Sequence, residues 1–452
     1  MKTIFRRMLL SGLLLLVCTV ESMAQFQHFS IHTHDSLALK LRVEQVDQVS
    51  IAPGGQAVTV NFSNGQSRQY DGKDVMNMAI RQTQLPLLFF RQNIEAPCVS
   101  RFIHETRYNP EDYSYSKVQN YVPADKGRFD FPRPFVFRMK DCTKGAPENE
   151  EENYRLLVSK SDDFTHAEQY ALEGDSAVVW TAIPGDTLRY RIVREGDGEL
   201  IQYGLALVDG MVRMIYLESV DNVRDVGGWR VEGGGRLRYG LMYRGSKLHT
   251  ADQTFISDAD VERMRALGIK VEFDLRGGTE ANNDNADYAY SRLGDDVAYK
   301  IINYGSMAYM QIFDKPQIMR LEWQYVYNAV TAGDPVFYHC SRGCDRVGTL
   351  SVLLEGVLGV SENDLCLDYE LSSFCGPNGT RTRNEKYVVP NYDFEGMMTT
   401  IKNYPGETLR DKFEYFWVNV CGISATQVRK FREAMIDTSF TGGRYPILAG
   451  RQ

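Results

Sequence analysis

The sequence predicts an α/β domain with a mostly parallel sheet flanked by helices over residues 213–445, preceded by small all-β modules. Three observations support this fold class. Before about residue 212, short runs alternate apolar and polar residues, as half-buried strands do. After it, helical patterns alternate with short β-rich runs, which is typical of α/β folds. Finally, the stretch FYHCSRGCDRVGT at 337–349 places a cysteine between a predicted strand and a predicted helix.

The first 24 residues have the organisation of a secretory signal. A basic segment precedes the apolar run 8–20, and Ser22-Met23-Ala24 offers small residues for cleavage. We therefore expect an exported protein, periplasmic or secreted. Lipoprotein cleavage before Cys18 is disfavoured, because bulky Val17 stands where a small residue is required. No later apolar run is long enough to predict a transmembrane helix.

Charge and cysteine content limit the function classes. The chain has 51 Lys and Arg against 59 Asp and Glu, a net charge of −8. Without residues 1–24, 48 basic and 58 acidic residues give −10, which excludes a basic nucleic-acid-binding surface. The seven remaining cysteines are odd in number and irregularly spaced, so we expect no disulfide framework. No spacing predicts a zinc site, and we expect neither a metal nor a cofactor.

Residues 25–128 are predicted to form an N-terminal β-rich region. Short alternating runs continue to about residue 75, and Asn64-Gly65 between two of them predicts a type I′ hairpin. Residues 129–212 contain the runs FVFRM, YRLLVS, AVVW and LRYRIV at regular spacing. This pattern suits a small β-sandwich and resembles a fibronectin type III module. These modules could position the C-terminal domain, bind a surface polymer or another partner that the sequence does not identify, or only cover the edge of that domain.

The C-terminal domain begins at about residue 213. Asp258 to Leu267 has helical apolar spacing, Gly268 marks its end, and IKVEFDL follows as a buried strand. The run VFYH is predicted as another strand, and VGTLSVLLEGVLGV as the helix after it. Ligands of open α/β sheets bind beyond the carboxyl ends of strands. The loop from Cys340 to Arg346 occupies that place.

This loop has the composition of an anion site. Its backbone N–H groups and the positive end of the following helix can surround an anion. Arg346 adds a planar fork of donors that matches phosphate oxygens. Cations and helix N-termini stabilise thiolates, so we expect Cys340 to be a thiolate at neutral pH. A thiolate facing a bound phosphate can attack phosphorus in line, form a cysteinyl-phosphate and lose it to water, without a metal.

Residues 339–346, HCSRGCDR, match the H-C-x-x-G-x-x-R signature of cysteine-dependent protein tyrosine and dual-specificity phosphatases. Further blocks continue the likeness over about residues 214 to 440, and the region resembles the bacterial tyrosine/serine phosphatase family. Members of that family also resemble atypical lipid and inositide phosphatases. The additional blocks are NVRDVGG at 222–228, YRGS at 243–246, FDLR at 273–276, DYELS at 368–372 and Thr408-Leu409.

The resemblance implies roles for individual residues. Cys340 would be the nucleophile and Arg346 the phosphate clamp. Asp274 or Asp345 would protonate the leaving group, and the sequence does not choose between them. The other phosphate-binding positions are Ser341, Arg342, Gly343 and Cys344.

Four further residues are expected to support the site. His339 would hold the loop and tune the thiol. Asn222, Arg224 and Asp225 would brace the site, although a structural ion pair between Arg224 and Asp225 explains those two equally well. For Asp274, capping of a helix N-terminus by the end of the strand is the structural alternative.

Two positions depart from the family pattern. Cys344 replaces a lysine that accompanies a preference for inositide head groups, which lowers that expectation, although Arg342 could supply a cation. Val347 replaces a Ser or Thr that helps the thiolate leave the intermediate, so hydrolysis could be slow unless Thr349 or Ser351 compensates. A reversible disulfide between Cys340 and Cys344 is a further hypothesis, and a small buried side chain is its structural alternative.

The sequence thus predicts a metal-independent phosphomonoester hydrolase, with phosphotyrosine, phosphoserine or phosphothreonine in a protein as the expected substrate. The alternatives are an inositol phosphate or phosphoinositide phosphatase and a binding protein that recognises phosphorylated ligands without turnover. A sulfur-transfer enzyme is disfavoured by Arg346 at this spacing and by the lack of a second rhodanese-like half.

Overall fold

The computed structural model describes residues 25–33, 37–42, 46–52, 56–62, 64–84, 87–107, 116–122, 132–139, 153–161, 164–196, 198–248, 256–278, 290–302, 305–375, 380–384 and 393–440. The predicted signal segment with Cys18, and also Cys142, lie outside the described residues. The described chain forms two compact units. The first takes its residues from 1–92, 136–179 and 186–207, and the second from 93–135, 180–185 and 208–452.

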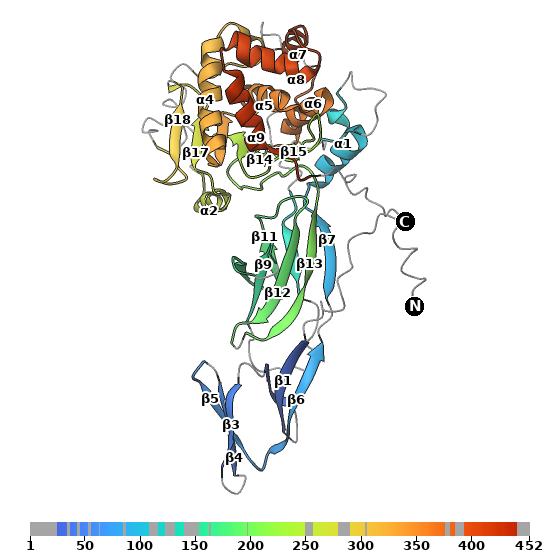
Figure 1. Ribbon diagram of the computed structural model, residues 1–452, viewed down its shortest axis with the longest axis vertical. Coiled ribbons are helices and arrows are strands. Elements are labelled where there is room, and N and C mark those ends of the chain that lie inside the picture. Colours follow the sequence, from blue (N-terminus) through green and yellow to red (C-terminus); the bar gives the residue numbers. More distant parts are fainter. Residues whose placement is uncertain are drawn as a thin grey trace, which may run out of the picture. The chain divides into compact units, whose positions relative to one another are not determined.

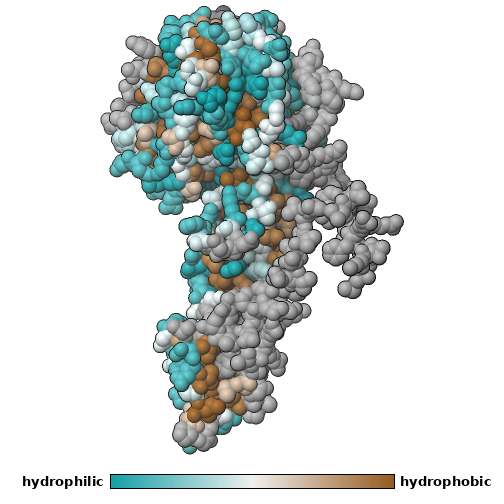
Figure 2. Space-filling view, viewed as in Figure 1, coloured by the Kyte–Doolittle hydropathy of each residue, from teal (hydrophilic) through white to brown (hydrophobic). Residues whose placement is uncertain are grey.

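The first unit contains only strands among its described elements (Figure 1). Two sheets come from the first 84 residues, in the orders β2-β1-β6 and β3-β4-β5. Ile31, Val58 and Val60 form a small core there, and Figure 2 shows hydrophobic residues in the part of this unit that contains β3 and β4. The strands are β1 Gln25–Thr33, β2 Leu37–Arg42, β3 Val46–Ile51, β4 Ala57–Phe62, β5 Ser67–Asp71 and β6 Val75–Gln84.

The hairpin expected at Asn64-Gly65 joins β4 to β5, but its turn differs from the prediction. Gly65 has φ +83°. The N–H of Gly65 donates to Phe62 O (2.9 Å), and the N–H of Phe62 donates to Gln66 O (2.8 Å). A type I′ hairpin has two residues between the paired positions, whereas three separate Phe62 from Gln66.

The second part of this unit pairs a five-stranded sheet, β10-β9-β12-β13-β7, with a two-stranded sheet, β11-β8. The sheets meet through aromatic rings: Phe137 lies 5.4 Å from Phe90 and 5.1 Å from Tyr190 between ring centroids. The five-stranded sheet includes β7, which lies before residue 129, the position at which the fibronectin-like module was predicted to begin. The strands are β7 Leu88–Asn93, β8 Phe135–Arg138, β9 Tyr154–Ser159, β10 Glu168–Ala171, β11 Ser176–Val179, β12 Thr187–Arg194 and β13 Leu200–Asp209.

The second unit is built on a mixed five-stranded sheet in the order β14-β16-β19-β17-β18. β14 is antiparallel to its neighbour, and the other four strands are parallel to one another. The C-terminal region therefore combines a mostly parallel sheet with helices, as predicted. The strands are β14 Arg224–Asp225, β16 Met242–Ser246, β17 Val271–Asp274, β18 Ala298–Ile301 and β19 Val336–Cys340; β15 Arg236–Leu237 pairs with β20 Ile436–Asp437.

Helices surround this sheet (Figure 1). The predicted helix at 258 is present as α2, with Ser257 capping its N-terminus and Gly268 at φ +75° after its end. α5 is buried over almost its whole surface and packs against α6, α8 and α9. The helices are α1 Pro97–Arg107, α2 Asp258–Ala266, α4 Pro316–Ala332, α5 Asp345–Leu358, α6 Glu362–Glu370, α7 Phe394–Lys402, α8 Leu409–Tyr415 and α9 Ala425–Met435.

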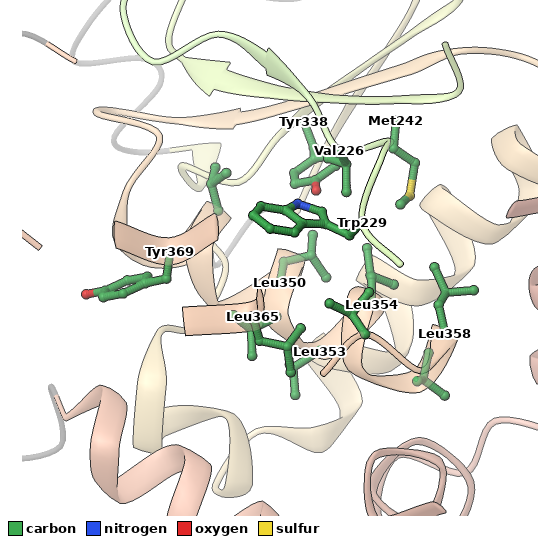
Figure 3. Packing of buried hydrophobic residues seen from close by; sticks show 14 of the residues in the cluster. Val226, Trp229, Met242, Tyr338, Leu350, Leu353, Leu354, Leu358, Leu365 and Tyr369 are labelled. Atoms are coloured by element: carbon green, nitrogen blue, oxygen red, sulfur yellow. The ribbon is translucent and has the colours of Figure 1, made fainter. Parts of the chain in front are cut away.

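The core of the second unit lies between the sheet and α5. Figure 3 shows Trp229, Met242 and Tyr338 on one side of it and Leu350 and Leu354 of α5 on the other. All five side chains are at most 2% exposed. Burying apolar surface stabilises by roughly 25 cal/mol per Å², so this core holds α5 firmly against the end of β19.

Helix α1 belongs to the same core, although it lies far upstream in the sequence. Val99, Phe102 and Ile103 are at most 1% exposed, and Phe102 lies 5.4 Å from Phe374 between ring centroids. Glu95, just ahead of the helix, accepts hydrogen bonds from the N–H groups of Met211 (2.8 Å) and Val212 (3.1 Å). No helix within the described ranges is both long and apolar enough to cross a membrane.

Candidate active site

Three parallel strands end at the same edge of the sheet. Ser246, the last residue of β16, pairs in register with Cys340, the last residue of β19. Asp274, the last residue of β17, pairs with His339. The edge beyond the carboxyl ends of parallel strands is the usual ligand site of α/β sheets. The structure therefore places the predicted nucleophile and one predicted acid at neighbouring strand ends.

The loop between β19 and α5 turns at Gly343. This residue has φ +68°, and a Cβ built on it would lie 2.6 Å from the carbonyl carbon and oxygen of Gly245. Both the left-handed backbone and the contact with β16 require glycine. Cys340 and Cys344 are 2% and 0% exposed, and α5 begins immediately afterwards at Asp345. The loop is thus pressed against the sheet and opens onto a helix N-terminus.

Asn222 holds the loop by hydrogen bonds to its backbone carbonyl groups. Its side-chain amide donates to Gly343 O (2.9 Å) and Arg342 O (3.2 Å), and also to the Ser372 hydroxyl (3.2 Å). Its own backbone has φ +59°, a conformation that asparagine tolerates better than most residues. Arg244 adds a hydrogen bond to Gly343 O (3.1 Å). The loop carbonyls consequently point toward these donors.

A buried charge cluster lies behind the loop. Asp368 accepts hydrogen bonds from Arg224 (3.1 Å) and Arg244 (2.6 Å), and none of the three side chains is more than 1% exposed. Burial would raise the pKa of Asp368, but the two arginines outweigh it and hold that pKa below its ordinary value. Burial, and then Asp368, raise the pKa of Glu355 well above its ordinary value. Two guanidinium groups therefore bind the carboxylate of Asp368 directly behind the loop.

Arg224 and Asp225 do not pair with each other, contrary to the ion pair considered from the sequence. Successive residues of a strand point to opposite faces, so Arg224 reaches Asp368 while Asp225 reaches Arg213 (3.1 Å). Asp225 also accepts the N–H groups of Gly227 and Gly240, both at 2.9 Å. Arg224 thus supports the loop through the charge cluster, and Asp225 fixes the turns beside β14.

His339 bridges two strands beneath the loop. Its Nε2 lies 2.9 Å from Glu272 Oε1 on β17, and its Nδ1 lies 3.8 Å from Asp274 Oδ1. The imidazole is fully buried. Its hydrogen bond goes to the neighbouring strand, and its expected role in holding the loop and tuning the thiol stays a prediction. His339 therefore fixes the distance between the strand ends that carry Cys340 and Asp274.

Asp274 is enclosed and occupied by other groups. It is 0% exposed, and the Arg276 side chain contacts both of its oxygens, at 3.0 and 2.7 Å. Tyr299 donates a further hydrogen bond (3.1 Å). Burial would raise the pKa of Asp274, but His339 and Arg276 outweigh it and lower that pKa to about 2. At neutral pH this side chain is a fully bonded carboxylate.

Asp345 has a different environment. Its side chain is 30% exposed at the first residue of α5. Oδ1 accepts hydrogen bonds from the Tyr309 hydroxyl (2.7 Å) and from Arg381 Nε (3.0 Å). Of the two predicted acids, Asp345 is the one whose carboxyl group reaches solvent at the loop.

The remaining loop positions differ in what they can contact. Arg346 is partly buried, and its Nη1 lies 3.5 Å from Leu275 O. Arg342 is exposed and Ser341 partly so. Cys344 donates to Arg342 O (3.3 Å), and burial raises the pKa of this thiol to about 12. Cys344 is therefore a protonated thiol that fills the inside of the loop.

The hydroxyls proposed to compensate for Val347 have other partners. Val347 is fully buried. Thr349 accepts a hydrogen bond from the Tyr309 N–H (2.9 Å), and the Ser351 hydroxyl lies 2.8 Å from Tyr338 Oη.

Sequence reasoning assigned no role to four residues that the structure brings to this site: Arg244, Asp368, Tyr309 and Arg381. The first two lie in segments that carried the family likeness, so their position in those segments was an available signal. Tyr309 and Arg381 lie outside every quoted motif. Within the described residues, no group of three or more His, Cys, Asp or Glu side chains could hold a metal ion.

Residues 215–437 match a family model described as "Tyrosine phosphatase family". The chain is 27% identical over 169 residues to a protein of Cupriavidus necator named "Putative tyrosine-protein phosphatase"; the match covers 34% of this chain and 60% of that protein. It is 28% identical over 143 residues to a "Tyrosine-protein phosphatase" of Nostoc commune, covering 28% of this chain and 48% of that protein. The chain spans about half the length of the curated relatives it matches.

Proposed function

Because residues 215–437 belong to the tyrosine phosphatase family, we propose that this protein hydrolyses phosphomonoesters through a cysteinyl-phosphate formed on Cys340. The observation that carries the proposal is the position of Cys340, at a buried strand end where a glycine-turned loop leads into the N-terminus of α5. Phosphate bound there would meet loop N–H groups, the helix dipole and Arg346. In this proposal, neither the formation nor the hydrolysis of the cysteinyl-phosphate requires a metal ion.

Asp345 is the better supported of the two proposed acids. A general acid must reach the leaving group, and the side chain of Asp345 is 30% exposed whereas Asp274 is 0% exposed. Asp274 is also bonded on both oxygens by Arg276. In this proposal Asp274 holds the end of β17 in place, and Asp345 exchanges the proton.

The proposed substrate is a phosphorylated protein side chain, outside the cytoplasm if residues 1–24 act as a signal. The names of the two relatives support phosphotyrosine. Exposed Arg342 offers a second cation at the loop, so inositol phosphates and phosphoinositides belong in the same comparison. A panel of phosphotyrosine, phosphoserine and phosphothreonine peptides, inositol phosphates and lipid vesicles would rank these classes by kcat/KM.

The activity is tested with p-nitrophenyl phosphate. The unmutated protein should release p-nitrophenol with EDTA present, and Cys340→Ser should lower kcat/KM by roughly 10⁴-fold or more, as loss of a nucleophile does. Cys366→Ser is the matched control, since Cys366 is also buried and free but lies in α6. No turnover by the unmutated protein, or equal turnover by Cys340→Ser, would contradict the proposal.

Val347 supports a second candidate function, a phospho-ligand-binding protein that turns over slowly. This residue is buried, and the hydroxyls of Thr349 and Ser351 are engaged elsewhere, so departure of the thiolate from the intermediate could lack help. Stopped-flow measurements separate the two functions. A burst of p-nitrophenol equal to the enzyme concentration followed by a slow phase favours binding and trapping, and linear release favours a phosphatase with rapid turnover.

A further inference from the structure

The carboxyl group of Asp345 is held asymmetrically. Oδ1 accepts both the Tyr309 hydroxyl (2.7 Å) and Arg381 Nε (3.0 Å), whereas the contact to Oδ2 is Arg381 Nη2 at 3.5 Å. Two short bonds from donors occupy the lone pairs of Oδ1. The proton of a neutral Asp345 is therefore directed to Oδ2.

Tyr309 is itself fixed to the helix that carries Asp345. Its backbone has φ +53°, a conformation that costs a bulky residue energy and persists where the surroundings enforce it. Its N–H donates to Thr349 Oγ1 in α5 (2.9 Å). Its hydroxyl lies 2.7 Å from the Tyr369 hydroxyl. Since Tyr309 donates to Asp345, Tyr369 is the donor in this second contact, and a directed chain runs from Tyr369 through Tyr309 to Oδ1.

Burial keeps this chain in one state. Tyr309 and Tyr369 are fully buried, and their rings lie edge to face with centroids 6.2 Å apart. Burial, followed by Tyr369 and Asp345, raises the pKa of Tyr309 above its ordinary value. The phenol therefore keeps its proton and remains a donor over the whole working pH range.

Arg381 reaches Asp345 from a separate segment, residues 380–384. Its side chain is 9% exposed, and its backbone is tied to Ser373 by two hydrogen bonds, at 2.8 and 3.0 Å. The backbone of Arg381 is thus fixed, and its side chain is largely buried. Both donors on Oδ1 consequently belong to parts of the fold that are independently fixed.

We propose that Tyr309 and Arg381 are positioning residues that bind Oδ1 of Asp345 and so reserve Oδ2 for proton exchange with the substrate. This inference rests on the proposed phosphatase function. Asp345 remains the catalytic residue; Tyr309 and Arg381 act through it. As the carboxyl group loses its proton, the charge that develops meets a phenolic O–H and a guanidinium already in place, which stabilises the transition state.

The proton balance follows from this arrangement. In the first step the Cys340 thiolate attacks phosphorus, the bond between phosphorus and the ester oxygen breaks, and that oxygen takes the proton from Oδ2. In the second step water attacks the cysteinyl-phosphate, Oδ2 accepts a proton from the water, and the sulfur leaves as thiolate. The enzyme returns to its starting state with one phosphate and one alcohol or phenol released.

The test is the dependence of kcat/KM on the basicity of the leaving group, measured with a series of aryl phosphates from 2,4-dinitrophenyl to phenyl phosphate. A strongly acidic phenol leaves without protonation, whereas phenol itself needs the acid. Tyr309→Phe should lose about threefold to tenfold in kcat/KM with phenyl phosphate, from one hydrogen bond, and almost nothing with the dinitrophenyl ester. Asp345→Asn should follow the same trend more steeply, by about 100-fold with phenyl phosphate.

Tyr338→Phe is the matched control. Tyr338 is also fully buried in this core and its hydroxyl lies 2.8 Å from Ser351, so the substitution removes a buried hydroxyl contact away from Asp345. Its slope against leaving-group basicity should equal that of the unmutated protein, although its melting temperature also falls.

The outcomes distinguish the two proposals. A steeper slope for Tyr309→Phe than for Tyr338→Phe supports the positioning role. Equal rate losses with every ester would overturn it, because a merely structural defect does not depend on the leaving group, and the phosphatase function would still stand. Absence of turnover by the unmutated protein would overturn both.

Discussion

The side-chain amide of Asn222 donates to the backbone carbonyl of Gly343 over 2.9 Å, although 121 positions separate the two residues in the sequence. This bond closes the loop after β19 against the turn before β14. Asn222 makes this bond from a backbone with φ +59°, a conformation that asparagine tolerates better than most residues.

Asn222→Gly tests this bond. Glycine accepts the left-handed backbone without cost, so the variant removes the amide alone. We expect a loss of about 1–3 kcal/mol in the free energy of unfolding, because buried loop carbonyls lose a donor, and about a tenfold loss in kcat/KM. Chemical denaturation and steady-state kinetics measure the two effects. An unchanged kcat/KM would show that the loop keeps its shape without Asn222.

Gly343→Ala should be far more damaging than an equivalent change elsewhere. At Gly343 a Cβ meets both a left-handed backbone and the Gly245 carbonyl at 2.6 Å, whereas at Gly333 it meets φ +81° with nothing within 4 Å. Gly333→Ala should cost about 1 kcal/mol of stability and leave activity intact. Gly343→Ala should abolish measurable binding of inorganic phosphate. Similar losses in the two variants would show that backbone conformation alone matters.

Stability should fall with rising pH because of Glu322. This side chain is fully buried on α4, and burial, partly offset by Ser306 and Arg346, raises its pKa to about 8. The folded state therefore binds this proton more tightly than the unfolded state. Its stabilising effect is complete below the ordinary pKa of a glutamate and is lost as the pH rises to about 8. Glu322→Gln should flatten this loss.

Melting temperatures between pH 5 and pH 9 check the expectation. The difference in melting temperature between Glu322→Gln and the unmutated protein should grow with pH. The corresponding difference in the free energy of unfolding should be a few kcal/mol at most. Glu433→Gln is the control, because Glu433 is 60% exposed. If the melting temperatures of Glu322→Gln and the unmutated protein changed with pH in parallel, Glu322 would not be the source of the pH dependence.

A reversible disulfide between Cys340 and Cys344 is disfavoured. Exchange requires a thiolate, and burial raises the pKa of Cys344 to about 12. After mild peroxide treatment, dithiothreitol should restore the activity of the unmutated protein to no greater extent than it restores the activity of Cys344→Ala. Rescue of the unmutated protein alone would establish the disulfide.

The sequence predicted those features of the fold that depend on neighbouring residues, such as the end of a helix or the loop between a strand and a helix. The stop at Gly268 needs only a left-handed residue after a helix, and the loop from Cys340 to Arg346 lies at a strand end because a strand and a helix adjoin it. Interactions over long sequence distances were not accessible. Nothing around residues 309 or 381 indicates that their side chains meet at Asp345, and the pairing of Asp225 with Arg213 rather than Arg224 depends on strand pleating that the sequence does not display.

Helix α1 bears on any attempt to study residues 215–437, which match the family model, without the rest of the chain. A fragment that starts at residue 213 would lack Phe102 and the residues around it. This would expose apolar surface beside Phe374 to solvent. The fragment would also lack Glu95 together with the backbone of Met211 and Val212, whose N–H groups this carboxylate accepts. The matched region, residues 215–437, is therefore smaller than the compact unit that contains it, and a fragment designed to fold independently should include α1.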